Sequence, residues 1–304
     1  MAKVKSTKIH DTLGDKILNI ILGIVLVLLI IIVGYPLIYV ISCSFSSSSA
    51  LESGLVVLWP VDFSLEAYEF VMQYKQVWVG FRNSVFYCAI AVFTDTIMTI
   101  VIAYCFSRRY FKARKFYTWL FFLTTRVSAG LIPNFVLRCN LGLFDNIWAV
   151  LISGVVSVGN VLILRTAINS NIPEDLFDAA RIDGASHIQA ILNIVLPLTK
   201  ATLSVLILYT LVGQWNEYFT SMLYLRNQNL YPLQLVLRPI MTAASTAGQM
   251  DTANMAMSYQ QQAQNGLENV RYALIIITTV PVLIAYFSVQ KAFKGGVMMG
   301  SLKG

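Results

Sequence analysis

Six long apolar runs, separated by polar or charged segments, dominate the hydropathy pattern of this chain. They cover about 17–41, 83–106, 116–137, 146–164, 201–223 and 272–290. Each run approaches or exceeds the roughly 20 residues that an α-helix needs to cross the apolar core of a bilayer. Because lipid offers the backbone no hydrogen-bond partner, each run is predicted to be a helix. The pattern therefore predicts an all-α membrane protein with six transmembrane helices.

The composition agrees with lipid as the main solvent of the chain, since 57% of the residues are hydrophobic and 12% are charged. A soluble domain has about 25% charged residues. The first run, 17–41, follows a basic segment and precedes a stretch of small residues, as the apolar part of a signal peptide does. It is longer than the roughly 7–15 apolar residues of such a peptide. We therefore expect it to remain as a span, with a cleaved signal peptide as the alternative.

The positions of Lys and Arg predict the orientation of the spans. The short turn 107–115 holds five of the 22 Lys and Arg residues, and the N-terminal segment, the loop after the fourth run and the tail also carry them. Because positively charged loops tend to stay in the cytoplasm, both termini are predicted to be cytoplasmic. A nucleic-acid surface explains the basic turn less well, since no soluble domain is predicted that would receive a duplex. The predicted organisation is a cytoplasmic N-terminus 1–16, a membrane domain 17–290 with a cytoplasmic loop 165–200 and external loops 42–79 and 224–271, and a cytoplasmic tail 291–304.

Several kinds of catalytic and metal site lack the residues that they need. The four cysteines contain no CxxC pair, and the two histidines are far apart and lack the spacing of metal ligands. The chain has no glycine-rich P-loop ending in Lys-Ser or Lys-Thr, so it is not expected to bind ATP in that way. We expect no catalytic residue, no metal site and no cofactor bound by this chain.

The loop 165–200 is polar and rich in small residues, in contrast to the apolar runs on either side. Pro173 suits the first turn of a helix, and the acidic residues that follow it suit the positive end of the helix dipole. The Asp-Gly pair at 183–184 is predicted to end this helix, and a second helix is predicted over about 186–194. A short alanine-rich helix is thin enough to dock in a groove of another protein. An ordinary connector between two spans is the alternative.

The same loop resembles the cytoplasmic coupling loop of binding-protein-dependent ABC importer permeases, which has the pattern x-Ala-Ala-x-x-Asp-Gly-Ala followed by Leu-Pro. In this chain the pattern consists of Asp178, Ala179, Ala180, Asp183, Gly184, Ala185, Leu196 and Pro197. The family usually has Glu at the first position, and Asp178 keeps that charge on a shorter side chain. The segments LWPVDFSLEAYEFV, GLIPNFVL, WNEYF, LYPLQLVLR and QKAFKGGVMMGSLKG resemble the carbohydrate-uptake branch of this family.

The resemblance implies a permease subunit of an ATP-driven importer of a sugar, in particular an oligosaccharide, in the bacterial cytoplasmic membrane. Its partners would be a second homologous permease, two cytoplasmic ATPases that hold ATP and Mg²⁺, and an external solute-binding protein. Glu174 joins the motif residues as an expected ATPase-coupling residue. The alternatives are a permease for a non-sugar solute and an ion-coupled secondary transporter that uses Asp95 and Glu217, although such a transporter normally has more spans or paired repeats.

A polar group of residues near the outer end of the fifth run is predicted to face the translocation pathway, because polar side chains are costly against lipid. The predicted pathway and substrate residues are Arg126, Asn134, Gln214, Trp215, Asn216 and Glu217. Trp215 would stack on a sugar ring and Asn216 would bind it through its amide. A hydrogen-bonded cluster between the two permeases is the alternative. Four arginines allow an acidic, uronate-containing sugar, or else contact headgroups or a subunit interface: Arg126, Arg138, Arg226 and Arg238.

Asp95 and Arg126 are predicted to form a buried ion pair. They lie near the middle of the second and third runs, which the short turn 107–115 joins as antiparallel neighbours. At 1.5 Å per residue, both would lie roughly 15–17 Å from the same end of the two helices. A charge alone at that depth would cost several kcal/mol, and pairing offsets much of this cost. The alternatives are that Arg126 binds an acidic substrate or that each charge faces water separately.

Overall fold

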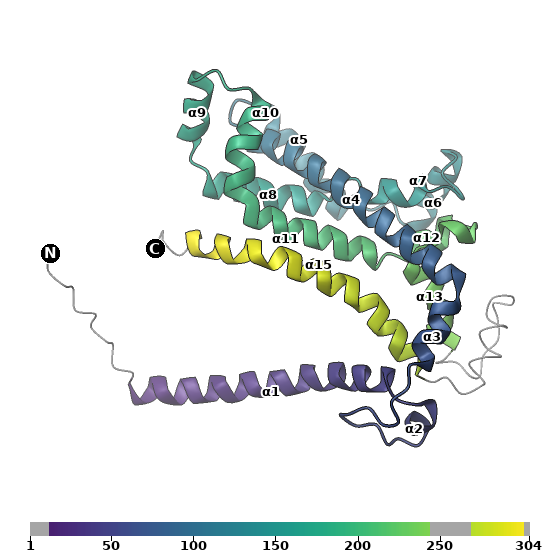
Figure 1. The fold of residues 1–304 in the computed structure, drawn as a ribbon. Coiled ribbons are helices and arrows are strands. Elements are labelled where there is room, and N and C mark those ends of the chain that lie inside the picture. The colour runs from purple at the N-terminus through teal and green to yellow at the C-terminus, as the bar shows by residue number, and fades with distance from the viewer. Residues whose placement is uncertain (1–11, 244–268, 301–304) are drawn as a thin grey trace. The chain divides into compact units, whose positions relative to one another are not determined.

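The computed structural model describes residues 12–243 and 269–300. Within these ranges every named element is a helix, so the prediction of an all-α fold is confirmed (Figure 1). The chain folds into two compact units, which consist of residues 12–70 with 269–276 and residues 71–243 with 277–300.

The smaller unit contains the first long helix of the chain and, packed near its C-terminal end, the first residues of the last helix. It contains α1 (Leu13–Ser44), the short α2 (Ser48–Glu52), and the first residues of α3 (Glu66–Gln73) and α15 (Val270–Gly300). A capping box formed by Thr12 and Asp15 satisfies backbone groups at the start of α1. Asn269 is fully buried, donates through Nδ2 to the Ser46 carbonyl at 2.9 Å and accepts from the Ser48 hydroxyl at 3.1 Å. These bonds fix the residue that precedes α15 against the end of α1.

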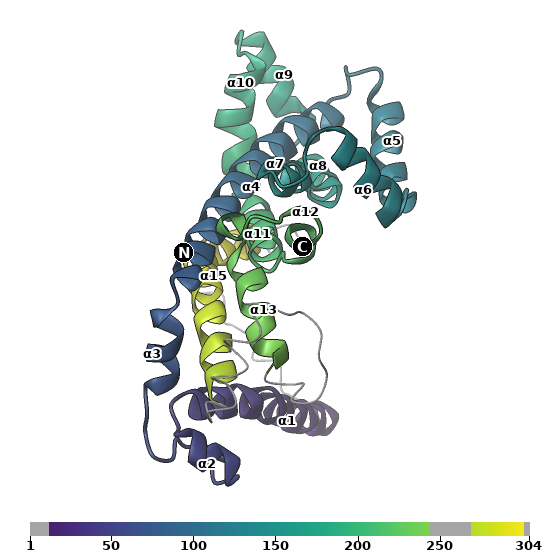
Figure 2. The ribbon, with the colours of Figure 1, turned by 90° about the vertical axis from the view of Figure 1, so that its right-hand side faces the viewer.

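The larger unit is built around α4 (Lys75–Ser107). This helix packs against α8 (Val158–Asn171), α11 (Leu196–Trp215) and α13 (Leu233–Ala243), as Figures 1 and 2 show. The core between α4, α8 and α11 includes Ala103, Val161, Leu164, Ile168, Leu203 and Leu206. Gly80 lets α13 approach α4 closely, since a Cβ at this position would lie 3.1 Å from the Leu233 Cα.

Among the described residues, five helical segments are long and apolar enough to cross a membrane, and a sixth span results if one bent helix pair is counted. The five are Leu13–Ser44, Lys75–Ser107, Trp148–Asn171, His187–Trp215 and Val270–Gln290. Each overlaps one of the predicted apolar runs, which confirms five of the six predicted spans as helical segments of spanning length.

The run 116–137 is not the single helix that the sequence predicted. Helices α5 (Arg114–Arg126) and α6 (Leu131–Asn140) are bent by 112° at the break between them. Gly130 adopts a φ of +86°, which glycine tolerates far better than other residues. Pro133 in the first turn of α6 lacks the N–H that a continuous helix would need. These two residues explain the break physically.

The fourth and fifth spans also differ from straight helices. The fourth consists of α7 (Trp148–Leu151), the 3₁₀-helix η1 (Ile152–Gly154) and α8. The fifth begins with α10 (His187–Ala190), continues through the π-helical η2 (Ile191–Val195) into α11 and ends at Trp215. The helix predicted over about 186–194 is therefore part of this span. The predicted run 201–223 is interrupted after Trp215, before the short α12 (Phe219–Tyr224) and the 3₁₀-helix η3 (Gln228–Leu230).

Candidate functional site

The loop between α8 and α10 contains one short helix, α9 (Glu174–Ile182), and a tight turn. Pro173 precedes α9 as its N-cap, one residue outside the predicted first turn. Gly184 has a φ of +77°, and the amide of Ala185 donates to the Ala180 carbonyl at 2.9 Å. This is a helix end of the kind that requires a left-handed residue. The prediction that the Asp-Gly pair ends the helix is confirmed.

Helix α9 has one buried face and one exposed face. Phe177 is 7% exposed and packs into the core of the larger unit near Tyr104. Ile182 is 86% exposed, and Leu176 and Ala179 are exposed with it. Asp175 and Asp178 are exposed as well. A short helix with this arrangement is held from one side and leaves a surface of apolar and acidic residues open on the other.

A buried arginine holds the inner face of α9. Arg108, the residue after α4, is 2% exposed, and its guanidinium carbon lies 3.4 Å from the centre of the Phe177 ring. Its Nη1 lies 3.7 Å from Glu174 Oε1, and Arg109 Nε lies 4.0 Å from Glu174 Oε2. Burial lowers the pKa of Arg108, and the neighbouring Glu174 carboxylate opposes this shift. Glu174 is therefore held between these two arginines, and its predicted role in ATPase coupling stays a prediction.

His187, the first residue of α10, lies against the same end of α4. Its Nδ1 lies 3.0 Å from the Tyr104 hydroxyl and 3.3 Å from the Tyr110 hydroxyl, and its ring stacks on Tyr110. No role for His187 was predicted from its sequence context, and Arg108 was predicted only as one of the charges that set orientation. The aromatic residues at 104, 110 and 177 were visible, but their approach depends on the fold.

Asp95 is 2% exposed and joins three helices of the larger unit. Its carboxylate accepts hydrogen bonds from the Ser157 amide (2.7 Å), Asn160 Nδ2 (2.8 Å) and the Thr210 hydroxyl (2.6 Å). A fourth, longer bond comes from Thr99 at 3.3 Å on α4 itself. Since Ser157 is the N-cap of α8, Asp95 holds the extended residue at which the fourth span is interrupted between η1 and α8.

The predicted ion pair between Asp95 and Arg126 is not formed between these two described residues. Arg126 is exposed at the end of α5, with its guanidinium carbon 5.2 Å from the centre of the Phe122 ring. The bonds from α8 and α11 already satisfy the Asp95 carboxylate. The predicted pair assumed that the third span is a straight helix beside the second, with Asp95 and Arg126 at equal depth. The bend after α5 means that the third span is not such a helix.

A polar cavity of about 340 Å³ lies beside Asp95. Its lining consists of Asp95, Ser153, Gly154, Val156, Ser157, Asn160, Tyr209, Thr210 and Gln214. Gln214 is thus the member of the predicted polar group at the end of the fifth span that reaches a cavity. Hydroxyl and amide side chains there are suited to hydrogen-bond a polar solute.

The other predicted residues at this end of α11 are engaged within the chain. Trp215 is 3% exposed, and its Nε1 donates to the Thr278 carbonyl at 3.0 Å, so its ring has no open face for a sugar, contrary to the prediction. Asn216 is exposed, but its Nδ2 donates to the Val212 carbonyl at 2.9 Å. Glu217 accepts from the Thr220 amide at 2.6 Å, at the start of α12.

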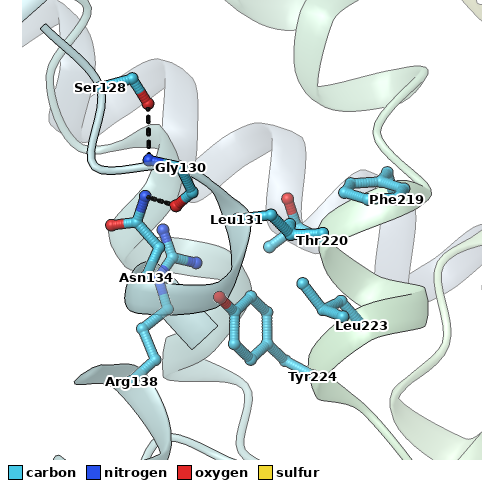
Figure 3. A pocket seen from close by; sticks show the side chains of 9 residues that line it. All are labelled: Ser128, Gly130, Leu131, Asn134, Arg138, Phe219, Thr220, Leu223 and Tyr224. Atoms are coloured by element: carbon cyan, nitrogen blue, oxygen red, sulfur yellow. Dashed lines mark hydrogen bonds between the residues drawn. The ribbon is translucent and has the colours of Figure 1, made fainter. Parts of the chain in front are cut away.

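A second cavity, of about 320 Å³, lies between the bend of α5 and α6 and helix α12 (Figure 3). Its lining consists of Ser128, Gly130, Leu131, Asn134, Arg138, Phe219, Thr220, Leu223 and Tyr224. Figure 3 shows Asn134 and Arg138 on one side and Phe219, Thr220 and Leu223 on the other. Asn134 donates through Nδ2 to the Gly130 carbonyl at 2.7 Å, which leaves its Oδ1 as an acceptor.

Within the described residues no group of three or more His, Cys, Asp or Glu side chains is placed to hold a metal ion.

Comparison with known proteins gave relatives along most of the chain, although no protein-family model matches it. The polygalacturonan/rhamnogalacturonan transport system permease protein YtcP of Bacillus subtilis (strain 168) is 32% identical over 269 residues, which are 88% of this chain and 92% of YtcP. Protein LplC of the same organism is 30% identical over 270 residues, with coverages of 88% and 89%. The crystal structure of a bacterial ABC transporter involved in the import of the acidic polysaccharide alginate has a chain that matches with a TM-score of 0.82 and 30% identity, over 94% of this chain and 100% of that one.

Proposed function

The chain belongs to the permease subunits of carbohydrate ABC importers, and from this premise we propose that it forms one half of the translocation pathway for an oligosaccharide. A second, homologous permease forms the other half, and an external solute-binding protein delivers the sugar. Two cytoplasmic ATPases bind ATP and Mg²⁺, so this chain is a transport subunit and no enzyme. Its place is the bacterial cytoplasmic membrane, with both termini on the cytoplasmic side, as its basic segments predict.

The observation that carries coupling to the ATPases is the two-sided helix α9. Phe177 and Glu174 hold its inner face at the end of α4, while Leu176, Ala179 and Ile182 are exposed. Exposed apolar residues on a short helix outside the predicted spans, with the exposed Asp175 and Asp178 beside them, suit a groove in a partner protein. We therefore assign ATPase docking to this outer face and assign Glu174 the role of holding α9 against the end of α4.

Ion-coupled transport through Asp95 and Glu217 has less support. The Asp95 carboxylate accepts four hydrogen bonds, and Glu217 accepts the Thr220 amide at the start of α12. Both groups thus have structural roles that need no bound ion.

Two of the compared proteins are named for acidic polymers, polygalacturonan and alginate, so an acidic oligosaccharide is the first substrate to test.

The proposed function is tested by purifying the protein with the products of its native operon and measuring oligosaccharide uptake into proteoliposomes. Copurification of a second permease, an ATPase and a solute-binding protein is expected, identified by mass spectrometry. Uptake should require ATP. A preparation that contains no ATPase partner, or uptake that follows an ion gradient without ATP, would contradict the proposal.

Two variants at one position test the coupling loop. Gly184→Leu should remove most of the sugar-stimulated ATP hydrolysis while the permease pair still assembles, because a left-handed conformation costs such a side chain about 1–2 kcal/mol. Gly184→Asn is the matched control, since asparagine tolerates this conformation, and should keep most of the activity. No Cβ contact disturbs the comparison, because nothing lies within 4 Å of a Cβ at this position. Normal stimulated hydrolysis in the leucine variant would refute the role of the turn.

A further inference from the structure

The cavity between α6 and α12 contains a half-buried arginine that has no counter-ion among the described residues. Both ion pairs in the described part of the chain involve Glu174, and no described carboxylate lies within 4.0 Å of Arg138. A cation in a membrane domain is costly unless a negative or polar group balances it. A bound anion is the natural complement of this charge.

The protein holds the Arg138 guanidinium in a fixed orientation by one of its nitrogens. Nη1 donates to the Ala149 carbonyl at 3.0 Å and to the Ser153 hydroxyl at 2.8 Å. The guanidinium carbon also lies 4.9 Å from the centre of the Tyr224 ring, which stacks on Phe135. Nε and Nη2 donate to none of the described residues. A planar guanidinium fixed in this way presents two parallel donors, the geometry that matches a carboxylate.

The remaining walls of the cavity suit a sugar ring. Phe219 is 44% exposed and offers an open aromatic face. The Thr220 hydroxyl makes no hydrogen bond with a described residue, and Asn134 Oδ1 is available to accept one. Figure 3 shows these groups on both sides of the cavity, together with Arg138. A site for a small inorganic anion would be expected to contain several basic side chains. This cavity instead combines one cation with aromatic, hydroxyl and amide groups, which suit a sugar ring that carries one carboxylate.

We propose that this cavity binds one uronic acid residue of an acidic oligosaccharide, with its carboxylate on Nε and Nη2 of Arg138 and its ring against Phe219. The cavity of about 320 Å³ lies at the low end of the roughly 300–1,000 Å³ typical of small-molecule sites, which suits a single sugar ring. The proposal rests on the proposed function, since it requires that a sugar enters this chain. Arg138 then distinguishes acidic from neutral sugars.

The test measures equilibrium binding of two matched probes, trigalacturonic acid and its methyl ester, to the complete importer in nanodiscs. The solute-binding protein is omitted, so that the dissociation constant reports the permeases alone, and binding is measured with and without ATP. Arg138→Gln should raise the Kd for the acid about tenfold or more, as the loss of charge-assisted hydrogen bonds predicts, and leave the Kd for the ester unchanged. For Arg138→Lys, the Kd for the acid should lie between those of the wild type and Arg138→Gln, because lysine keeps the charge but not the two parallel guanidinium donors.

The control is Arg226→Gln, which removes an exposed arginine that lies over Phe144 and does not line the cavity. It should leave both dissociation constants unchanged. Equal losses for acid and ester in Arg138→Gln would show a structural role and overturn the proposal, as would an equal effect of the control. A wild-type importer that takes up a neutral oligosaccharide but binds the acid no better than the ester would also overturn it, while the permease function stands.

A lipid phosphate offers the same chemistry as a carboxylate, so the binding experiment has two lipid arms. One uses phosphatidylcholine alone and the other adds phosphatidylglycerol. The proposal expects the same tenfold effect of Arg138→Gln in both arms. An effect on acid binding that occurs only with phosphatidylglycerol would assign the arginine to a lipid headgroup and overturn the uronate site.

Discussion

Replacement of Asp95 by asparagine is expected to cost far less stability than replacement by leucine, because the site needs an acceptor more than it needs a charge. Two of its donors have a second acceptor: the Thr210 hydroxyl lies 3.1 Å from the Leu206 carbonyl, and Asn160 Nδ2 lies 3.0 Å from the Thr210 hydroxyl. The Ser157 amide donates only to Asp95, at 2.7 Å. The N–H of the residue that caps α8 therefore depends on this one side chain.

The magnitude follows from what each variant leaves unpaired. Asp95→Leu strands the Ser157 N–H, which costs about 1–3 kcal/mol. It also removes side-chain hydrogen bonds that average about 0.6 kcal/mol each in membrane proteins. With three such bonds, from Thr99, Asn160 and Thr210, the expected loss is about 3–5 kcal/mol in total. Asp95→Asn keeps an oxygen for the Ser157 amide, but its amide nitrogen replaces the oxygen that accepts from Asn160 Nδ2 and the Thr210 hydroxyl. It therefore loses these two acceptor bonds, which costs about 1–2 kcal/mol in total.

The assay is the unfolding of the purified complex in detergent, followed for both variants and for Arg126→Gln alone and combined with Asp95→Asn. Since Arg126 lies over Phe122 and not at the carboxylate, the two losses should add to within about 0.5 kcal/mol. A coupling energy above about 1 kcal/mol would restore the ion pair that the sequence suggested. An asparagine variant as unstable as the leucine variant would refute the argument that the acceptor is decisive.

Glu174→Gln should lower the unfolding temperature of the complex more than Asp175→Asn, because Glu174 balances a buried guanidinium whereas Asp175 is exposed and forms no ion pair with a described residue; equal shifts would contradict this. Backbone amides of residues 226 and 227 donate to the Asp145 carboxylate and lower its pKa. This stabilisation is present above the pKa of an unfolded aspartate, about 3.9, and is lost as the pH falls through the lower folded value. Hydrogen exchange at the Asn227 amide should therefore quicken in Asp145→Ala at neutral pH, and unchanged protection would refute the role of Asp145.

The sequence was most informative where one local property determines the structure. Long apolar runs predicted helical spans because lipid leaves the backbone no other way to satisfy its hydrogen bonds. The Asp-Gly pair predicted the end of α9 because few residues other than glycine accept a φ of +77°. The break in the third span had a local signal as well, since Gly130 and Pro133 lie only three residues apart.

The roles of individual polar side chains depended on packing that the sequence does not reveal. Depth along a helix was estimated correctly enough to place Asp95 in the interior, but depth says nothing about rotation around the helix axis. That rotation turns Asp95 toward α8 and α11, whose donors are 62 and 115 residues away in sequence. Trp215 is covered for a similar reason, since Phe81 and the Thr278 carbonyl contact it from distant segments.

The end of α4 gives the strongest physical reason to regard the loop between α8 and α10 as more than a connector. Burying an arginine is costly, and Arg108 is buried where it contacts Phe177 and Glu174 of α9. The same helix binds α8 and α11 through Asp95, twelve residues before its end. On the proposed function, a displacement of α9 would therefore act on a helix that is hydrogen-bonded to two other spans. A simple connector would need neither the buried cation nor this rigid link, whereas a loop that transmits force from an ATPase would need both.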